Sequence, residues 1–486
     1  MSKESEALYD AITQVDDALL PEPARPKRQP PSWRAFAAIA AVLALLVSPF
    51  VLDFGTHRIN VTKEDPFTLA QPVYPEMAAY PDEAAFGDDY DAVAEAYRAW
   101  QADIVRQTNQ PSGYANGLDA YLRQSTQVFL TGAGTENRSY SPLNVYMALA
   151  MLAETADGES RSQILTLLGA ESIDTLRAQA SAVWNANYRD DGMTKSVLAS
   201  SLWLRDDTDY NQTAVDTLAQ SYYASVFRGE MGSDAYNQAL QSWLNEQTGG
   251  LLEKQAAMES FDSRTALGLA TTICFQTKWA APFSESATQT GVFHAATGDE
   301  TPDLMHRREA QTYYWGERFG AVALPLESGG AMWLLLPDEG VTPETLLADD
   351  EAMDFILHGS AEWANSKDLL VNLSLPKFDT ASHYSLLEGL KDLGVTDICD
   401  PAKADFSPML SDAEGVYLDS ANHAVRVAID EEGVVAAAYT VMAEAGAGAP
   451  PDDEIDFTLD RPFVFAITGD QGLPLFIGIV NHVSDM

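Results

Sequence analysis

The chain has 486 residues, of which 46% are hydrophobic and 21% charged, which is the composition of a globular protein and not of a disordered one. Its 72 acidic and 29 basic residues give a formal net charge of −43, which repels phosphate backbones and excludes nucleic-acid binding as a function. Because Cys274 and Cys399 form no C-x-x-C pair and no H-E-x-x-H is present, neither a metal site nor a cofactor is predicted.

The N-terminal part of the chain has the pattern of a membrane anchor. Residues 35–52 form an uncharged run rich in Ala, Leu and Val, which as a helix rising about 1.5 Å per residue just crosses a hydrocarbon core of about 30 Å. Four basic residues precede the run: Arg25, Lys27, Arg28 and Arg34. The positive-inside rule therefore predicts a cytoplasmic tail at 1–34, a transmembrane signal-anchor at 35–54 and an extracellular remainder.

The predicted localisation is thus the cell membrane, as a single-pass protein with its folded domain outside. A cleaved signal peptide and a buried core helix are the alternatives. The signal peptide is disfavoured because the tail before the run is long and no clean A-x-A site follows it. Residues 55–113 are predicted to be an extracellular linker with a helix-like stretch at 88–106.

Residues 114–486 have the pattern of a single α+β domain. Apolar spacing predicts helices at 118–130 and 145–152, the second of which is apolar all round and must be buried. Further apolar runs predict six strands, at 197–205, 268–275, 369–375, 424–429, 463–468 and 474–480. Since strands and helices are interleaved without regular alternation, a doubly wound parallel sheet is disfavoured.

No catalytic motif is found in the sequence. A G-x-S-x-G nucleophile elbow, a phosphate-binding loop and a dinucleotide-binding glycine fingerprint are all missing, and no Ser, His and Asp have the spacing of a known triad. We therefore predict that the protein is not an enzyme. We expect its two cysteines to be buried free thiols, with a disulfide between them as the alternative.

One segment near the C-terminus combines strand-forming and small residues. Residues 433–443 contain neither proline nor charge, so every N–H in the segment can donate to a β-ladder. In a strand, Val434, Ala436, Ala438 and Thr440 would share one face of small side chains, while Tyr439 would lie on the other. Such a segment can enter between two strands of a sheet. A surface loop with an alanine-rich helical turn is the alternative.

A series of short motifs runs through the same domain in a fixed order. They are Asn137-x-x-x-Ser141-Pro142-x-Asn144, Trp243–Gly249, Phe275–Phe283, Leu375-Pro-Lys-Phe378, His423-Ala-Val, Asp460–Phe463 and Pro474–Gly478. Each motif is weak by itself, but together they resemble the serpin family of serine protease inhibitors across residues 114–486. On this basis the chain is identified as a bacterial, membrane-anchored member of that family.

The resemblance implies an α+β fold with three β-sheets, about eight or nine helices and an exposed reactive loop. It implies a monomer that needs no cofactor and whose partner is a target serine protease. The protease would cleave the loop and form an acyl-enzyme, after which the severed loop would insert into the central sheet and trap the enzyme covalently. A non-inhibitory serpin that serves as a surface binding module is the alternative.

The resemblance also assigns roles to single residues. Glu431, Gly433, Val434, Ala436, Ala437 and Ala438 match the hinge of the reactive loop. Gly433 suits a hinge turn because glycine tolerates φ > 0. Ser141, Asn144 and His423 match the gate below the opening sheet, called the shutter, and Trp279 matches the aromatic residue at the point where insertion starts, called the breach.

The reactive-site bond is placed by the spacing usual in the family. Counting from Glu431 gives Ala447–Gly448, whereas counting back from Pro462 gives a bond about four residues later, near Pro451. Ala447–Gly448 is preferred because prolines at 450 and 451 make poor cleavage sites. A small residue before the bond points to an elastase-like or subtilisin-like protease.

Overall fold

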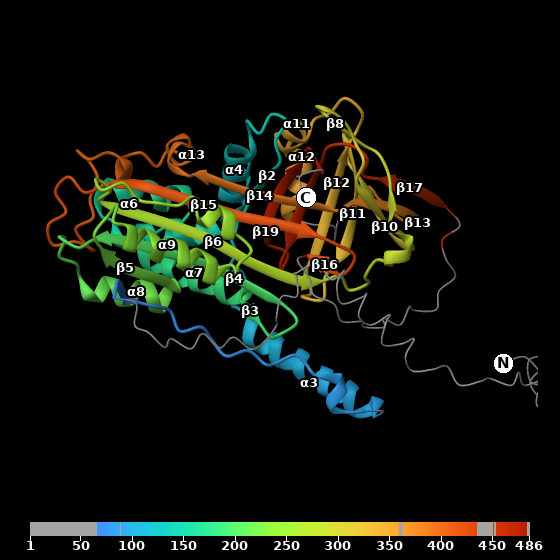
Figure 1. Cartoon of the computed structure of the whole chain (residues 1–486), viewed down its shortest axis with the longest axis horizontal. Helices are drawn as coiled ribbons and strands as arrows, with labels where there is room; N and C mark the ends of the chain where they lie inside the picture. Colours follow the sequence, from blue (N-terminus) through green and yellow to red (C-terminus); the bar gives the residue numbers. More distant parts are fainter. Residues whose placement is uncertain (1–65, 88, 359–362, 435–450, 452, 484–486) are drawn as a thin grey trace, which may run out of the picture. The chain divides into compact units, whose positions relative to one another are not determined.

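The computed structural model describes residues 66–87, 89–358, 363–434, 451 and 453–483. The predicted tail and membrane span lie outside these residues, as do Ala436, Ala437, Ala438, Ala447 and Gly448. The described part contains three sheets and helices on several of their faces (Figure 1). The predicted α+β class with three sheets is confirmed, although the eleven α-helices in the described residues exceed the predicted eight or nine.

The first sheet has eight strands in the order β1-β5-β4-β6-β16-β15-β14, with β3 paired to β4. Its strands are β1 (Thr68–Ala70), β3 (Arg189–Asp190), β4 (Lys195–Arg205), β5 (Ala224–Gly229), β6 (Leu267–Lys278), β14 (Phe378–Ser385), β15 (Leu418–Ile429) and β16 (Gly433–Val434). Strands β4 and β6 are buried along almost their whole length, which explains why their charged residues, Lys195, Arg205 and Lys278, stand only at strand ends.

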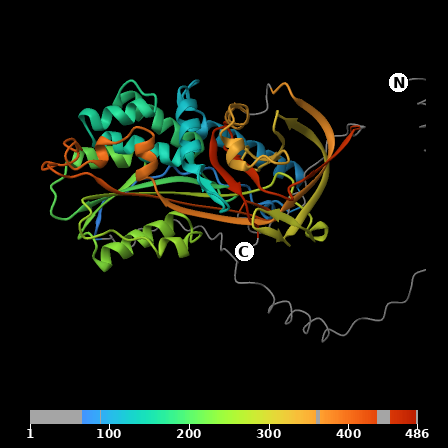
Figure 2. The same cartoon turned by 90° about the horizontal axis from the view of Figure 1, so that it is seen from above.

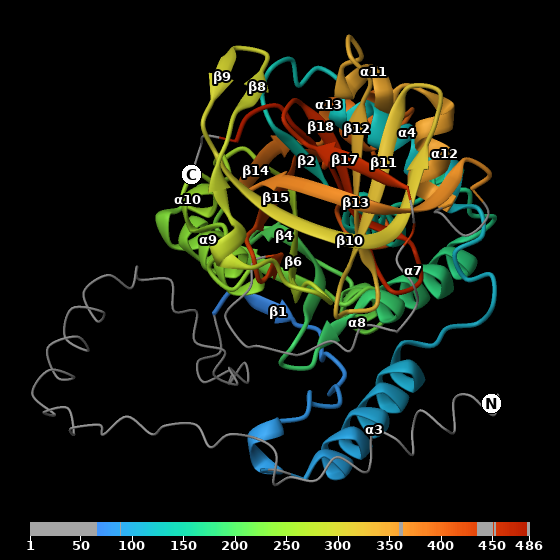
Figure 3. The same cartoon turned by 90° about the vertical axis from the view of Figure 1, so that its right-hand side faces the viewer.

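The second sheet has nine strands in the order β17-β13-β10-β11-β12-β18-β19-β2, with β7 paired to β10, and the third is a hairpin. The strands of the larger sheet are β2 (Arg138–Tyr140), β7 (Gln289–Thr290), β10 (Asp303–Trp315), β11 (Phe319–Pro325), β12 (Ala331–Pro337), β13 (Ser366–Pro376), β17 (Glu454–Thr458), β18 (Phe463–Thr468) and β19 (Pro474–Val480). The hairpin pairs β8 (Phe293–Ala295) with β9 (Gly298–Glu300). Figure 3 looks onto β10 and β13, which run side by side.

The α-helices range from one turn to five. They are α3 (Tyr90–Thr108), α4 (Leu118–Leu130), α5 (Pro142–Thr155), α6 (Gly158–Leu167), α7 (Ile173–Asn187), α8 (Gln212–Ser221), α9 (Asp234–Gln247), α10 (Glu253–Ala256), α11 (Pro343–Leu347), α12 (Asp350–His358) and α13 (Leu387–Asp392). Short 3-10 helices occupy Glu83–Ala85, Glu285–Ala287 and Asp397–Cys399. In Figure 2, α9 and α10 lie on one side of the eight-stranded sheet and α5 on the other.

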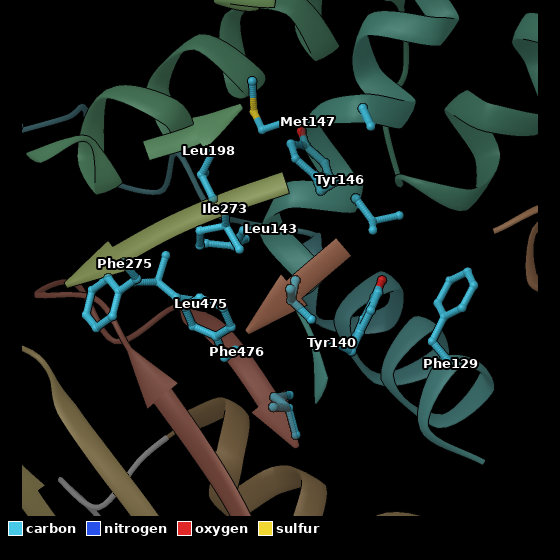
Figure 4. Packing of buried hydrophobic residues seen from close by; sticks show 14 of the residues in the cluster. Phe129, Tyr140, Leu143, Tyr146, Met147, Leu198, Ile273, Phe275, Leu475 and Phe476 are labelled. Atoms are coloured by element: carbon cyan, nitrogen blue, oxygen red, sulfur yellow. The ribbon is translucent and has the colours of Figure 1, made fainter. Parts of the chain in front are cut away.

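The core is built around α5, which confirms the predicted buried helix. Pro142 occupies its first turn, where a missing N–H costs nothing, and nearly every residue after it is buried. Figure 4 shows Leu143, Tyr146 and Met147 of this helix facing Ile273 of β6 and Phe476 of β19. The helix therefore joins the two large sheets through a single apolar core. All six predicted strands are also found.

Part of the predicted linker packs on the domain. Strand β1 pairs antiparallel with β5 at the edge of the eight-stranded sheet. Further on, the N–H of Tyr80 donates to the carbonyl of Asp191, and Trp100 of α3 is buried beneath the guanidinium of Arg189. The domain boundaries themselves stay predictions.

The predicted membrane localisation is contradicted. Among the described residues, no helix combines the length and the apolar composition that a bilayer crossing needs. The 19-residue α3 comes close in length, but it carries five charges that a hydrocarbon core disfavours: Asp91, Glu95, Arg98, Asp103 and Arg106.

Both cysteines are free; Cys274 is buried in β6, whereas Cys399 is only partly buried.

Candidate functional site: the seam between β6 and β15

The eight-stranded sheet has a seam at its centre, where β6 and β15 run parallel. They pair directly from Leu267 and Leu418 up to Thr272 and Ala424, and the hydroxyl of Thr272 donates to the carbonyl of Ala424 at 2.9 Å. Beyond this point the two strands diverge and β16 lies between them, paired antiparallel with both (Figure 1). The seam is closed along one half and is already filled by a short strand in the other.

The turn that leads from β15 into β16 is held by a half-buried aspartate. Oδ1 of Asp430 accepts from the N–H groups of Glu432 at 2.9 Å and Gly433 at 3.1 Å. Gly433 does not adopt a positive φ, which corrects the reason given for it above. Its role is close approach, because a Cβ at this position would lie 2.3 Å from the carbonyl oxygen of Thr277.

Glu431 is buried, and each of its carboxylate oxygens has a partner. Nζ of Lys377 lies 2.8 Å from one oxygen and the hydroxyl of Thr288 donates to the other at 2.7 Å. Burial acts to raise the pKa of Glu431, but the hydrogen bonds from Lys377 and Thr288 outweigh it and the pKa is lowered overall. The carboxylate is therefore charged and holds the turn before β16 to Lys377, which directly precedes β14.

Trp279 ties the same turn to the end of β6. Its indole N–H donates to the carbonyl of Asp430 at 2.8 Å, and its backbone N–H donates to the carbonyl of Glu432 at 3.0 Å. The side chain is 2% exposed and meets Phe283 edge-on. Trp279 thus lies at the end of β6 next to β16, and its role as the breach residue stays a prediction.

His423, one of the three predicted gate residues, lies in the middle of β15, near the last pair of the parallel ladder. It is fully buried between the rings of Tyr140 and Tyr384, and burial lowers its pKa to about 3. Its Nε2 accepts from the backbone N–H of Ser141 at 3.2 Å, so the neutral ring carries its proton on Nδ1. Asn144 lies one turn further along α5.

Several polar atoms of this gate have no hydrogen-bond partner among the described residues. They are Oγ of Ser141, both side-chain polar atoms of Asn144 and Nδ1 of His423, all of them buried. Each unsatisfied buried group costs about 1–3 kcal/mol. These unpaired atoms make the described fold around His423 less stable than a fully paired arrangement would be.

The segment predicted to be the reactive loop lies between two described anchors. Its first residues form β16, and its far end enters β17, which runs parallel to β13. There the backbone N–H of Leu370 donates to the carbonyl of Asp453 at 2.9 Å, and Lys367 pairs with the carboxylate of Asp453 at 2.5 Å. The alanines of the hinge and the predicted Ala447–Gly448 bond lie between these anchors, outside the described residues.

Sequence analysis missed three residues of this site, Asp430, Lys377 and Thr288. Lys377 belongs to a motif that was recognised, but its pairing with Glu431 is a contact between strands that are distant in sequence. Conversely, the structure brings together the residues that were predicted to meet: Ser141, Asn144 and His423 in one group, and Glu431, Gly433 and Trp279 in another.

The comparisons with known proteins agree on one family. The model of the serpin (serine protease inhibitor) family matches residues 124–483. Serpin-Z2B of Triticum aestivum is 28% identical over 365 residues, which are 71% of this chain and 90% of that protein. Serpin-ZX of Arabidopsis thaliana is 27% identical over 374 residues, or 74% and 95% of the two chains.

Solved structures show the same likeness. The thermophilic serpin tengpin in its native state is 25% identical, with a TM-score of 0.69 over 78% of this chain and 96% of that chain. The native stressed conformation of AtSerpin1 from Arabidopsis is 24% identical, with a TM-score of 0.67 over 77% and 100%. The second likeness supports the fold alone.

Proposed function

Since the chain belongs to the serpin family, we propose that a serine protease cleaves it within residues 435–452. The cleaved loop then inserts between β6 and β15 and traps the protease. The observation that carries the proposal is β16, which already pairs with β6 through Gly433 and Val434 and with β15 through Val434. If the strand continued beyond Val434, it would only have to separate the parallel pairing of β6 and β15.

The register of β16 supports cleavage at Ala447–Gly448. Gly433 lies opposite Lys278, so each further residue of the loop moves one residue back along β6, and Glu444 would meet Leu267, where β6 begins. On the other side, Val434 lies opposite Ile429, so residue 445 would meet the first residue of β15. A loop cut after Ala447 is long enough to fill the seam.

The same register gives each inserted side chain its neighbours. Directly opposed residues share a face of the sheet. Ala436 would meet Phe275 and Val427, and Ala438 would meet Ile273 and Val425. These four side chains are buried, so only small residues fit beside them.

Thr440 would lie opposite His423 and Thr271 in this register. Its hydroxyl can accept from the Nδ1–H of His423, which has no partner among the described residues. Insertion would therefore satisfy a polar group that the intact fold leaves unpaired.

Strand insertion supplies the free energy that trapping requires. A central strand of about ten residues adds about ten backbone hydrogen bonds at about 0.5–1.5 kcal/mol each. The total, on the order of 10 kcal/mol, is comparable with the stability of a whole domain. Work of this size can deform the active site of an attached protease before its acyl-enzyme hydrolyses.

The proposal is tested by incubating the protein with an elastase-like serine protease. We expect a covalent complex that survives denaturing electrophoresis, and a released C-terminal peptide that begins at Gly448. Ala438→Arg should give cleavage without the complex, because the inserted arginine would face the buried Ile273. The matched Ala449→Arg variant should still trap, because residue 449 stays with the released peptide.

Cleavage of the unmodified protein without any trapped complex would contradict inhibition and favour a non-inhibitory binding module. A subtilisin-like protease is the second enzyme to test, since it also accepts a small residue before the cleaved bond.

A further inference from the structure

The connection between α10 and β6, residues 257–266, crosses the seam. It continues directly into β6, and the ring of Phe261 packs so closely on Gly268 that a Cβ there would lie 2.3 Å from it. Glu259, however, reaches strands on the far side of the seam. One of its oxygens accepts from Nδ2 of Asn422 in β15 at 2.6 Å, and the other pairs with Nε2 of His383 in β14.

A second contact crosses the seam at the start of this region. Nη1 of Arg426 in β15 donates to the carbonyl of Leu251, just before α10, at 3.0 Å. Arg426 is itself held by both oxygens of Asp379 in β14. Because residues 251–266 are joined covalently to β6, these contacts connect the two halves of the sheet that have to part.

The Glu259 contact lies over the path of the inserting loop. In the register derived above, Val441 would lie opposite Asn422 and share its face of the sheet. Glu259 binds Asn422 on that face. A strand cannot pass below Glu259 until the connection lifts, so the strength of this contact sets how readily the seam opens.

We propose that Glu259 and His383 form a latch across the seam, closed while His383 is protonated and loosened when it loses its proton, so that loop insertion accelerates as the pH rises through neutrality. The proposal rests on the proposed function, because it describes a control on the same insertion.

His383 is the group of this pair whose proton the surroundings affect. The hydrogen bond to Glu259 raises the pKa of His383, and partial burial opposes it more weakly. His423 faces the opposite side of β15 and is neutral. Other charged groups on these elements face one another: Arg264 pairs with Asp262 and is also influenced by the charge of Asp419, and Arg426 pairs with Asp379.

The sign of the pH dependence follows from that shift. Because the folded-state pKa of His383 lies above its ordinary value of about 6.5, the ion pair contributes fully below about pH 6.5 and is lost as the pH rises through the folded-state value. The latch is therefore closed in mildly acidic solution and opens as the pH rises through the raised pKa of His383.

The test measures seam opening without a protease, whose own activity varies with pH. A synthetic peptide with the sequence of residues 433–444 is added to the intact protein, and its rate of incorporation is followed on native gels at about pH 6 and about pH 8. We expect incorporation to be about five- to tenfold faster at the higher pH, the change produced by weakening a partly buried ion pair by about 1 kcal/mol.

Two substitutions should remove this pH dependence in opposite ways. His383→Gln should give fast incorporation at both pH values, because it cannot form the ion pair, and His383→Arg should give slow incorporation at both. His306→Gln is the control: His306 binds Ser374 in the other large sheet and should keep the original ratio.

Equal rates at both pH values in the original protein, or a ratio that persists in His383→Gln, would overturn the latch. A lack of incorporation at every pH in every variant would instead overturn the proposed function, since the seam would then not accept a strand at all.

Discussion

At the scale of single residues, the site depends on which buried polar atoms are paired. Glu431 is paired twice, whereas Ser141, Asn144 and His423 are left with unpaired atoms in the described residues. The first arrangement holds the hinge turn in place, and the second makes the intact seam less stable than it could be. Sequence analysis placed Ser141 and His423 together but could not show that their polar atoms lack partners.

Replacing Lys377 by methionine should leave Glu431 as a buried charge with one partner. Breaking a buried pair in this way costs about 3 kcal/mol, and we expect a loss of that order in the free energy of unfolding measured with urea at neutral pH. Because the pKa of Glu431 is lowered, its contribution is present above about pH 4.5 and is lost as the pH falls through the folded-state value.

Lys391→Met is the control for this prediction, because Lys391 pairs with Glu388 on an exposed surface and should leave stability unchanged. An equal loss of unfolding free energy in both variants would mean that burial of Glu431 does not strengthen its ion pair with Lys377.

Ser141→Ala should increase the free energy of unfolding of the intact protein by about 1 kcal/mol, because the buried hydroxyl has no partner to lose. Ser139→Ala is the matched comparison: its hydroxyl bonds Thr380 at 3.2 Å, so its removal should be destabilising. Thermal unfolding of the two variants side by side gives the answer. Destabilisation by Ser141→Ala would show that this hydroxyl is satisfied in solution.

At the scale of elements, α5 positions the gate. Its buried side chains contact both large sheets, and its N-terminus presents Ser141 and Asn144 to β15. Apolar composition alone predicted that this helix is buried. The position of β16 was not predicted, since only two of its residues are paired and no sequence period is visible over such a length.

Leu149→Ala within α5 should lower the free energy of unfolding by about 3 kcal/mol, as expected when a fully buried leucine leaves a cavity. Val105→Ala, on the exposed side of α3, should have little effect, since Val105 is 62% exposed. Urea denaturation measures both. Similar small losses would indicate that the core closes around the missing side chain.

At the scale of the whole molecule, the proposed function requires that the intact fold is not the most stable arrangement of the chain. The parallel ladder between β6 and β15 can be replaced by two antiparallel ladders with the inserted loop. Cleavage within residues 445–451 should therefore raise the melting temperature by at least about 15 °C, given a gain on the order of 10 kcal/mol.

Scanning calorimetry of the intact and the nicked protein measures this difference. The cut must be made with so little protease, or during so short an incubation, that most of the cleaved protein carries no trapped protease. Identical melting temperatures would mean that the loop stays outside the sheet after cleavage.

The sequence by itself determined the family, the α+β class, the buried central helix and the principal strands. These follow from local patterns, because an apolar period or a short motif is readable within one segment. Tertiary structure decided the rest: the close approach at Gly433, the pairing of Glu431 with Lys377, and the contact of Glu259 with His383 across the seam. Each of these joins segments distant in the chain, and only the packed fold sets the distance between them.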